Sequence, residues 1–138
     1  CVNFGPPETI PEKFRDRIFM PHTATTTLMR ATGEEMRALG VKMAEKLNGA
    51  SGPVALLVPL RGFSHYDQEN GPEAMDFAGN PAGTFHDPEA DKAFLEGVQS
   101  TLDQERVRLL ELDLHINDEA FSKKVAEVFL CLAGIAAV

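Results

Sequence analysis

The chain has 138 residues and a formal net charge of -8, and 43% of its residues are hydrophobic. This length suits one domain, and the acidic excess argues against a nucleic-acid partner, because binding to a phosphate backbone needs a basic surface. No apolar run long enough to span a membrane is present, and two distant cysteines with no metal-ligand spacing fit a reducing cytoplasm.

The first thirty residues contain three short apolar or β-branched runs. Residues 1–4 predict a strand that ends at Gly5, and residues 18–20 predict a second strand that Pro21 stops. Residues 25–29 predict a third short strand or an extended loop. Because the chain begins with Cys and inside a predicted strand, we expect it to be part of a longer protein.

The middle of the chain predicts a helix, a strand and a long loop. Thr32 is a good helix N-cap, and Glu35 completes a capping box. Residues 53–60 are almost continuously apolar, which is typical of a parallel strand buried on both faces. Residues 62–85 are rich in Gly, Pro, Asn and Asp, so we expect a mobile loop.

Two helices and one strand follow. Asp87 and Pro88 give the start of a helix, and residues 107–114 predict a strand. The last helix follows Asn117, and its expected buried face consists of Phe121, Val125, Val128, Phe129 and Leu132. This alternation predicts a single α/β domain over residues 1–138, a three-layer, mainly parallel open sheet with helices on both faces.

The first polar segment, residues 22–30, precedes a predicted helix. It combines the imidazole of His22, four threonine hydroxyls including that of Thr27, and the guanidinium of Arg30. Hydroxyls, a cation and free helix N–H groups suit a phosphate or a carboxylate. The alternative is a Thr-rich edge strand with a solvent-facing Arg30.

The second polar segment directly follows the apolar strand and contains Arg61, Gly62, Ser64 and Asp67. In open α/β sheets, ligands bind beyond the carboxyl ends of the strands, and glycine lets a backbone approach a ligand closely. The alternative is an ordinary loop in which Arg61 pairs with a nearby carboxylate.

The third polar segment, around His115 and Asn117, lies at another strand-to-helix turn. His115 suits a general acid, a general base or a ligand-orienting donor, while Asn117 and Asp118 are also good helix caps. We expect Arg30, Arg61 and His115 to converge at one edge of the sheet. The common cofactor fingerprints are absent and no metal motif is found, so neither a metal nor a catalytic residue is assigned.

Taken in order, several stretches resemble the proteins related to a tobamovirus resistance protein, the Tm-type ATP-binding domain family. The resemblance covers nearly the whole chain, which is similar to the C-terminal subdomain of that two-subdomain unit. The chain departs from the family pattern at Thr23-Ala24, usually Asn-Pro, and at Ala31, usually Thr. The matching stretches are Val2-Asn3-Phe4-Gly5, Thr27-Leu28-Met29-Arg30 with Thr32 and Glu35, Lys46-Leu47-Asn48, Gly52-Pro53-Val54, Pro59-Leu60-Arg61-Gly62 with Ser64 and Asp67, Asp87-Pro88-Glu89-Ala90-Asp91, and His115-Ile116-Asn117-Asp118.

The resemblance implies nucleotide binding, with ATP as a possible ligand and an N-terminal subdomain as the other wall of the site. We also expect a homo-oligomer, no membrane partner and a cytoplasmic location. A plant relative acts by binding a viral replication protein, so the resemblance does not fix one activity.

The leading hypothesis is therefore a half-site for a nucleotide or another anionic metabolite. Arg30 and Arg61 would hold the anionic group, Thr27 and Ser64 would donate hydrogen bonds, and the histidines would orient the ligand or exchange protons. One rival is a hydrolase or lyase that uses histidine, arginine and acidic side chains at the strand ends. The other is a protein-interaction module whose acidic residues 67–105 form the recognition surface.

Overall fold

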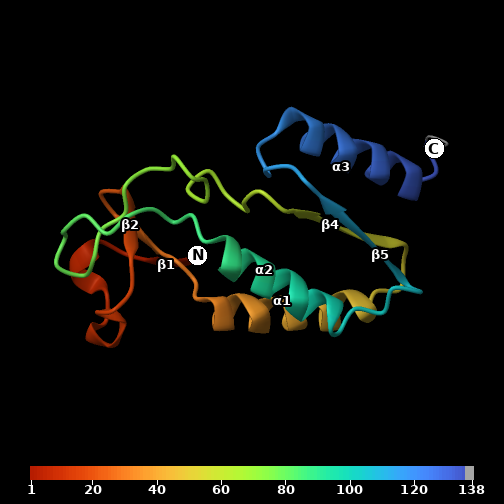
Figure 1. Cartoon of the computed structure of the whole chain (residues 1–138). Helices are drawn as coiled ribbons and strands as arrows, with labels where there is room; N and C mark the ends of the chain where they lie inside the picture. Colours follow the sequence, from red (N-terminus) through yellow and green to blue (C-terminus); the bar gives the residue numbers. More distant parts are fainter. Residues whose placement is uncertain (136–138) are drawn as a thin grey trace. The chain divides into compact units, whose positions relative to one another are not determined.

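The computed structural model describes residues 1–135, which form two compact units. The antiparallel unit comprises Cys1–Thr32 and Tyr66–His86, and the parallel unit comprises residues 33–65 and 87–135. Helices and strands are both present (Figure 1), so the predicted α/β class is confirmed. The expected single, mainly parallel sheet is wrong, because the strands form two separate sheets. No helix in residues 1–135 is long and apolar enough to cross a membrane.

The antiparallel unit contains three short strands, β1 (Val2–Phe4), β2 (Phe19–Thr23) and β3 (Thr26–Met29), in the order β1–β3–β2. Two single-turn 3-10 helices, η1 (Pro7–Thr9) and η2 (Glu12–Phe14), connect β1 to β2. All three predicted strands are therefore confirmed. Pro21, however, lies within β2 and does not stop it. A proline lacks the N–H that a central strand needs, and β2 tolerates it because it lies at the edge of this sheet.

The two faces of this sheet carry different apolar clusters. One face packs Ile10, Phe19 and Met29 with Phe4 and Phe14. The other cluster contains Met20, Ala74 and Phe85, with Ile18, Leu28 and Tyr66 packed against it. Neighbouring residues such as Leu28 and Met29 fall into different clusters, because successive side chains of a strand point to opposite faces.

The irregular segment Tyr66–His86 is packed into this unit. Ala74 and Phe85 are fully buried, and Met75 exchanges two backbone hydrogen bonds of 2.8 Å with Phe19. The segment is irregular, as its glycines and prolines predicted. Met75 nevertheless pairs with Phe19 in the antiparallel manner, as a residue of a further strand beside β2 would.

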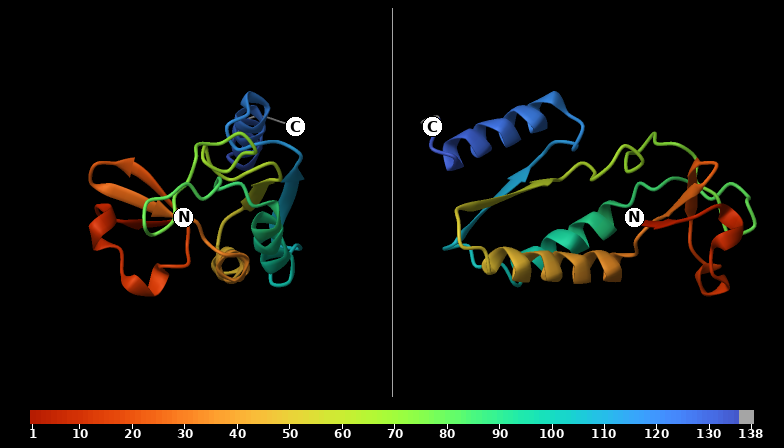
Figure 2. Two further views of the ribbon diagram at one scale, coloured as in Figure 1. Left: turned by 60° about the vertical axis from the view of Figure 1, so that its left-hand side comes forward. Right: turned by 180° about the vertical axis from the view of Figure 1, so that it is seen from behind.

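The parallel unit contains α1 (Gly33–Asn48), β4 (Val54–Pro59), α2 (Pro88–Gln99), β5 (Val107–Leu112) and α3 (Glu119–Leu132). Strands β4 and β5 pair in parallel, from Val54 opposite Val107 to Pro59 opposite Leu112. Helices α1 and α2 lie side by side on one face of this pair and α3 lies on the other (Figures 1 and 2). Within this unit the expectation of helices on both faces is confirmed.

The helix starts follow the sequence signals closely. Helix α1 begins at Gly33, directly after the predicted cap Thr32. At the start of α2, the Oδ1 atom of Asp87 accepts a hydrogen bond from the N–H of Ala90 at 3.0 Å, and Pro88 occupies the first helical position. The predicted cap of α2 is thereby confirmed.

Helices α1 and α2 touch backbone to backbone at two glycines. A Cβ atom added to Gly40 would lie 2.2 Å from the carbonyl oxygen of Phe94, and one added to Gly97 would lie 2.2 Å from that of Arg37. Each glycine therefore lets the other helix approach closer than any side chain would permit. The two glycines therefore allow the tight packing of α1 against α2.

The parallel pair is less buried than the sequence predicted. Val54 to Leu57 are only half-buried, and Val58 and Pro59 are the buried residues of β4. Within residues 1–135, β4 pairs only with β5, so one edge of each strand stays open. The expectation of a strand buried on both faces is therefore wrong in this chain.

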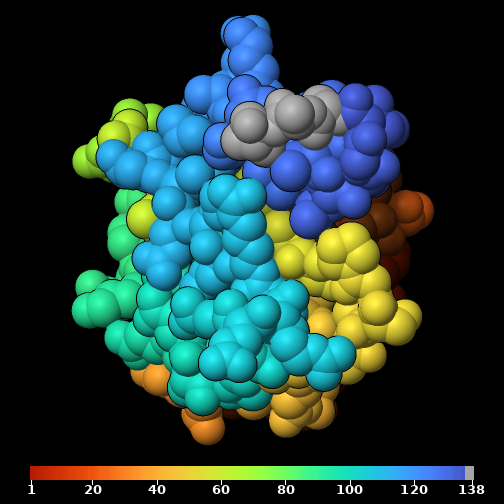
Figure 3. All heavy atoms as spheres, turned by 90° about the vertical axis from the view of Figure 1, so that its right-hand side faces the viewer, coloured from red at the N-terminus to blue at the C-terminus, as the bar shows by residue number. Residues whose placement is uncertain are grey.

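Helix α3 is covered along only part of the predicted face. Phe121 and Val128 are buried, whereas Val125 and Phe129 are 41% and 65% exposed. The sequence indicates which residues are apolar, but not which of them the thin two-stranded sheet covers. In Figure 3, α3 lies above the turn that joins α2 to β5 on one face of the parallel unit.

Candidate functional site

The nine predicted site residues are divided between the two units. Five belong to the parallel unit, namely Arg61, Gly62, Ser64, His115 and Asn117. Four belong to the antiparallel unit, namely His22, Thr27, Arg30 and Asp67. Arg30 follows β3 of the antiparallel sheet, so it is not on the sheet edge where Arg61 and His115 lie. The expected convergence holds for Arg61 and His115 and is wrong for Arg30.

At the carboxyl edge of the parallel pair, the loops after β4 and β5 are joined by backbone hydrogen bonds. The N–H of Arg61 donates to the carbonyl of Leu114, and the N–H of Ile116 donates to the carbonyl of Gly62, both at 3.1 Å. Gly62 has a φ of +127°, a conformation that favours glycine. This pairing holds the two predicted polar segments side by side.

Arg61 and Asp113 form a two-pronged ion pair at this edge. The Nε and Nη2 atoms of Arg61 each donate to one carboxylate oxygen of Asp113 at 2.7 Å. The hydrogen bond from Arg61 holds the pKa of Asp113 below its usual value, and Asp113 in turn raises the pKa of Arg61. The side chains are 61% and 75% exposed, so the pair faces solvent.

The pairing of Arg61 with a nearby carboxylate was the alternative to a ligand site, and it is the arrangement observed. The two bonds use two of the five N–H donors of a guanidinium. The other three are left for an additional acceptor. Asp113 thus fixes the orientation of the cation without occupying all of its donors.

His115 connects the same two loops. Its Nδ1 atom accepts a hydrogen bond from the N–H of Asn117 at 3.2 Å. The proton of the neutral ring is then on Nε2, which donates to the carbonyl of Ser64 at 3.0 Å. Because both ring nitrogens are engaged, His115 orients the loops, and proton exchange with a ligand requires one of these bonds to break.

Asp118 has a different role from the predicted cap. It occupies the N-cap position of α3, but its side chain makes no capping hydrogen bond to that helix. Its Oδ2 atom accepts a hydrogen bond from the N–H of His115 at 2.8 Å. The carboxylate therefore stabilises the turn that carries His115.

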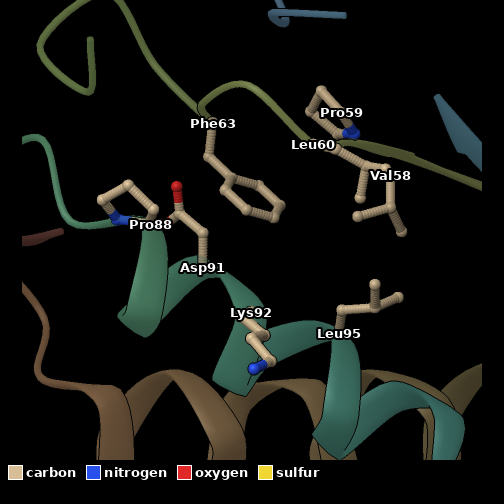
Figure 4. A pocket seen from close by; sticks show the side chains of 8 residues that line it. All are labelled: Val58, Pro59, Leu60, Phe63, Pro88, Asp91, Lys92 and Leu95. Carbon is tan, nitrogen blue, oxygen red and sulfur yellow. The ribbon is translucent and has the colours of Figure 1, made fainter. Parts of the chain in front are cut away.

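An apolar pocket of about 120 Å³ opens beside this edge. One wall comes from the end of β4 and the segment after it, and the other from the first turns of α2 (Figure 4). Asp91 is the buried acid of the pocket, at 8% exposure, and Lys92 lies next to it. The lining residues are Val58, Pro59, Leu60, Phe63, Pro88, Asp91, Lys92 and Leu95.

The sequence analysis missed Asp91, although a signal for it was present. Pro88, Asp91 and Leu95 are spaced by three and four residues, which puts them on one face of the helix. Asp91 also lies three and seven residues before Phe94 and Val98, which are buried. An acid on such a helix face is unusual and marks Asp91 as a candidate site residue.

In the antiparallel unit, Arg30 and Asp67 form a buried pair. Arg30 is 7% and Asp67 2% exposed, and the Nη2 atom of Arg30 lies 3.7 Å from Oδ1 of Asp67. The Nε atom of Arg30 donates to the carbonyl of Phe85 at 2.8 Å. His86 lies close by, with Nδ1 3.9 Å from the same oxygen of Asp67. The solvent-facing Arg30 considered above is therefore wrong, since its guanidinium is held inside the unit.

Thr27 and His22 are the other two predicted site residues of this unit. Thr27 is two residues from Met29 along β3, so its side chain is on the Met29 face of the sheet and not on the Leu28 face. His22 is exposed on β2, where its Nδ1 atom forms a hydrogen bond with the hydroxyl of Tyr66. The hydrogen bond expected from Thr27 to a ligand, and the orienting or proton-exchanging role expected of His22, stay predictions.

Residues 1–133 match the family model described as "Uncharacterised protein family (UPF0261) C-terminal domain". A UPF0261 protein of Rhizobium meliloti is 39% identical over 134 residues, covering 96% of this chain and 31% of that protein. A UPF0261 protein of Clostridium tetani is 39% identical over 126 residues, covering 91% of this chain and 28% of that protein.

The plant resemblance noted in the sequence is confirmed as well. The ToMV resistance protein Tm-1 of Solanum lycopersicum is 35% identical over 130 residues, which cover 94% of this chain and 16% of that protein. The chain thus spans less than a third of the length of these relatives. From residue 1 to residue 133, the chain belongs to the UPF0261 family and corresponds to its C-terminal domain.

Proposed function

We propose that the carboxyl edge of β4 and β5 is a half-site for a small anionic ligand, with ATP or another phosphorylated or carboxylated metabolite as the ligand class. The observation that carries the proposal is the exposed guanidinium of Arg61, which Asp113 holds in one orientation at this edge. Ligands of open α/β sheets bind at this end of the strands, and a planar guanidinium suits phosphate or carboxylate oxygens.

Each residue of the edge has a defined part in the proposed site. Arg61 contacts the anionic group, while Gly62 allows the backbone beside it to approach the ligand. The hydroxyl of Ser64 and the exposed amide of Asn117 donate hydrogen bonds to the ligand. His115 keeps their two loops in register.

The apolar pocket beside Leu60 receives the uncharged part of the ligand, such as a nucleotide base. Arg30 and Asp67 stabilise the antiparallel unit and do not contact the ligand in this proposal, since both are buried and paired with each other. A region corresponding to the N-terminal part of the longer relatives would supply the other wall of the site. The proposal further places the protein in the cytoplasm, as a homo-oligomer. The free thiols of Cys1 and Cys131 fit a reducing compartment.

Isothermal titration of the full-length protein with ATP, and separately with inorganic phosphate, tests the proposal. We expect saturable binding that Arg61→Ala removes and that Arg61→Lys weakens, because lysine keeps the charge but loses the planar fork. Binding should also weaken as ionic strength rises.

Arg108→Ala is the matched control. Arg108 is an exposed cation near the opposite end of β5, so its removal changes the net charge equally and leaves the carboxyl edge intact. Equal loss of ATP binding in Arg61→Ala and Arg108→Ala would point to nonspecific charge attraction. Unchanged binding in Arg61→Ala would exclude the proposed site.

A further inference from the structure

The two open edges of the parallel pair differ in composition. Strand β5 carries two exposed charged residues, Arg108 and Glu111, whereas β4 consists of aliphatic residues and Pro59. Charged side chains on an edge strand discourage further strands from pairing with it, while a continuous apolar run is typical of an interior strand. Strand β5 therefore has the composition of an edge strand, and β4 that of a strand with a neighbour on each side.

The backbone of β4 presents two N–H groups to its open edge. The N–H of Leu60 donates to the carbonyl of Leu112, in the direction of β5. Because successive backbone N–H groups of a strand point to opposite sides, those of Ala55 and Leu57 point away from β5. Within residues 1–135, β4 pairs only with β5, so this side of β4 has no strand beside it. Such an edge is a template for pairing with another strand.

The helices of this unit cover a wider sheet than the one observed. In the left view of Figure 2, α1 lies beside α2 on the side of β4, away from β5. On the opposite face, α3 contacts β4. Packed helices lie about 8–10 Å apart and paired strands about 4.8 Å apart, so α1 and α2 together span roughly four strands. Two are present, which leaves room for further strands beside β4.

Both of these helices carry apolar side chains that this unit does not cover. On α1, Leu39 is 52% exposed, and Met43, one turn further along, is only half-buried. On α3, Val125 and Phe129 are exposed and also lie one turn apart. Large apolar side chains on the two helices that flank an open strand are typical of a surface that another segment of protein covers.

A second copy of the chain does not fit this edge. Two copies of β4 would pair antiparallel about a two-fold axis perpendicular to the sheet, which keeps α1 and α2 of both copies on one face. Because α1 lies about 8–10 Å beyond α2, it occupies the place where the second copy would carry its own α2. The helices of the two copies would overlap, so a symmetric dimer through β4 is excluded.

We infer that the open edge of β4 binds a strand from another region of the same polypeptide, outside residues 1–138. The chain spans less than a third of the length of its bacterial relatives, so a protein of their length contains such a region. The added strand bonds to the backbone of Ala55 and Leu57, with α1 on one of its faces and α3 on the other. Strand β4 thereby becomes an interior strand, as its composition indicates.

Hydrogen exchange of the full-length protein, resolved to single residues and corrected for intrinsic rates, tests this inference. The amides of Ala55 and Leu57 should exchange at least about tenfold more slowly than those of Leu109 and Glu111, which point to the open edge of β5 by the same alternation. The amide of Val58 points to β5, so its protection shows that the parallel pair is folded. Free exchange of Ala55 and Leu57 beside a protected Val58 would overturn the inference, and so would equal protection at both edges.

Leu57→Pro and Leu109→Pro give a second, matched test in the full-length protein. Each replaces a half-buried leucine and removes one N–H that points to an open edge of the pair. Proline is tolerated on an edge strand and disfavoured between two strands. Leu57→Pro should therefore lower the melting temperature by at least about 4 °C more than Leu109→Pro does. Equal shifts in the two variants would contradict an interior position of β4.

Phe129→Asp replaces Leu57→Pro if that variant does not fold. An aspartate on a covered face of α3 lowers the melting temperature of the full-length protein, whereas Ala126→Asp, at another exposed position of α3, should leave it unchanged. The same melting temperature in both variants would mean that no strand covers this side of α3, and the inference would be wrong. None of these results bears on ATP binding, which Arg61 controls in the other proposal.

Discussion

The contact between α1 and α2 predicts a large effect of a single methyl group at Gly97. A Cβ atom there would lie 2.2 Å from the carbonyl oxygen of Arg37, whereas carbon and oxygen normally approach to about 3.3–3.6 Å. The carbonyl belongs to the helix backbone, so relief requires the helices to separate by roughly 1 Å. A gap of that size removes a quarter to a half of the dispersion energy of each atomic contact that it opens.

The free-energy change of Gly97→Ala combines two opposing effects. Overpacking a tight contact costs about 1–3 kcal/mol and occasionally more. Alanine in place of glycine inside a helix stabilises the folded state by about 0.5–1 kcal/mol. Because the clash is with backbone, we expect the first effect at the upper end of its range, and a net loss of about 2 kcal/mol in the free energy of unfolding.

Urea denaturation followed by circular dichroism measures this loss, and Gly33→Ala is its control. Gly33 is a glycine of α1 that faces α2, but a Cβ atom there would lie an ordinary 3.8 Å from its nearest neighbour, so its change should stay within about 0.5 kcal/mol. Gly40→Ala should resemble Gly97→Ala, and the double variant should lose less than the sum, since one separation relieves both clashes. A Gly97→Ala protein as stable as the wild type would refute the close approach of the two helices.

Three further predictions follow from individual contacts. Asp87→Ala removes the side-chain cap of α2 and should cost about 0.5–2 kcal/mol in urea denaturation, while a loss below 0.3 kcal/mol would contradict the capping role. In hydrogen exchange, the amides of Phe19 and Met75 should be protected, because they bond to each other across the sheet edge; free exchange of Met75 would show that this segment is detached. The pKa of Asp113, followed by carboxyl NMR, should rise towards its ordinary value in Arg61→Ala, and an unchanged pKa would mean that the pair does not form in solution.

The sign of the last effect defines its pH window. The folded-state pKa of Asp113 is depressed, so the stabilisation from its pair with Arg61 is present above the ordinary pKa of an aspartate. It is lost as the pH falls through the lower, folded-state pKa. Because both side chains face solvent, the contribution to stability is small even where it is fully present.

Local signals in the sequence predicted the parallel unit well. Asp87 and Pro88 define the start of α2 through a bond within four residues, and α1 begins directly after its predicted cap, Thr32. Arg61 and His115 meet because each follows a strand of the same parallel pair. These features depend on neighbours in the chain and on one pairing rule, so the sequence contains enough information to find them.

The features that the sequence did not predict depend on pairing between distant segments. Arg30 follows a strand of the antiparallel sheet because β3 pairs with β1 and β2, which no local pattern indicates. The exposure of Phe129 depends on how wide a sheet α3 covers. The face on which Thr27 lies, by contrast, follows from the sequence alone. Thr27 is two residues before Met29, and residues two apart in a strand share a face.

The Arg30–Asp67 and Arg61–Asp113 pairs differ in burial, and this difference decides which of them suits a ligand. Arg30 and Asp67 are almost completely buried, so removing one partner would leave an uncompensated charge inside the unit, at a cost of about 3–5 kcal/mol. A ligand anion cannot replace Asp67 without meeting that cost. Arg61 and Asp113 form their pair in solvent, where such a pair adds little to stability. An incoming phosphate or carboxylate can therefore share Arg61 with Asp113, or displace Asp113, with little loss of folding stability. The guanidinium of Arg30 is needed to neutralise a buried carboxylate, whereas that of Arg61 is available to a ligand.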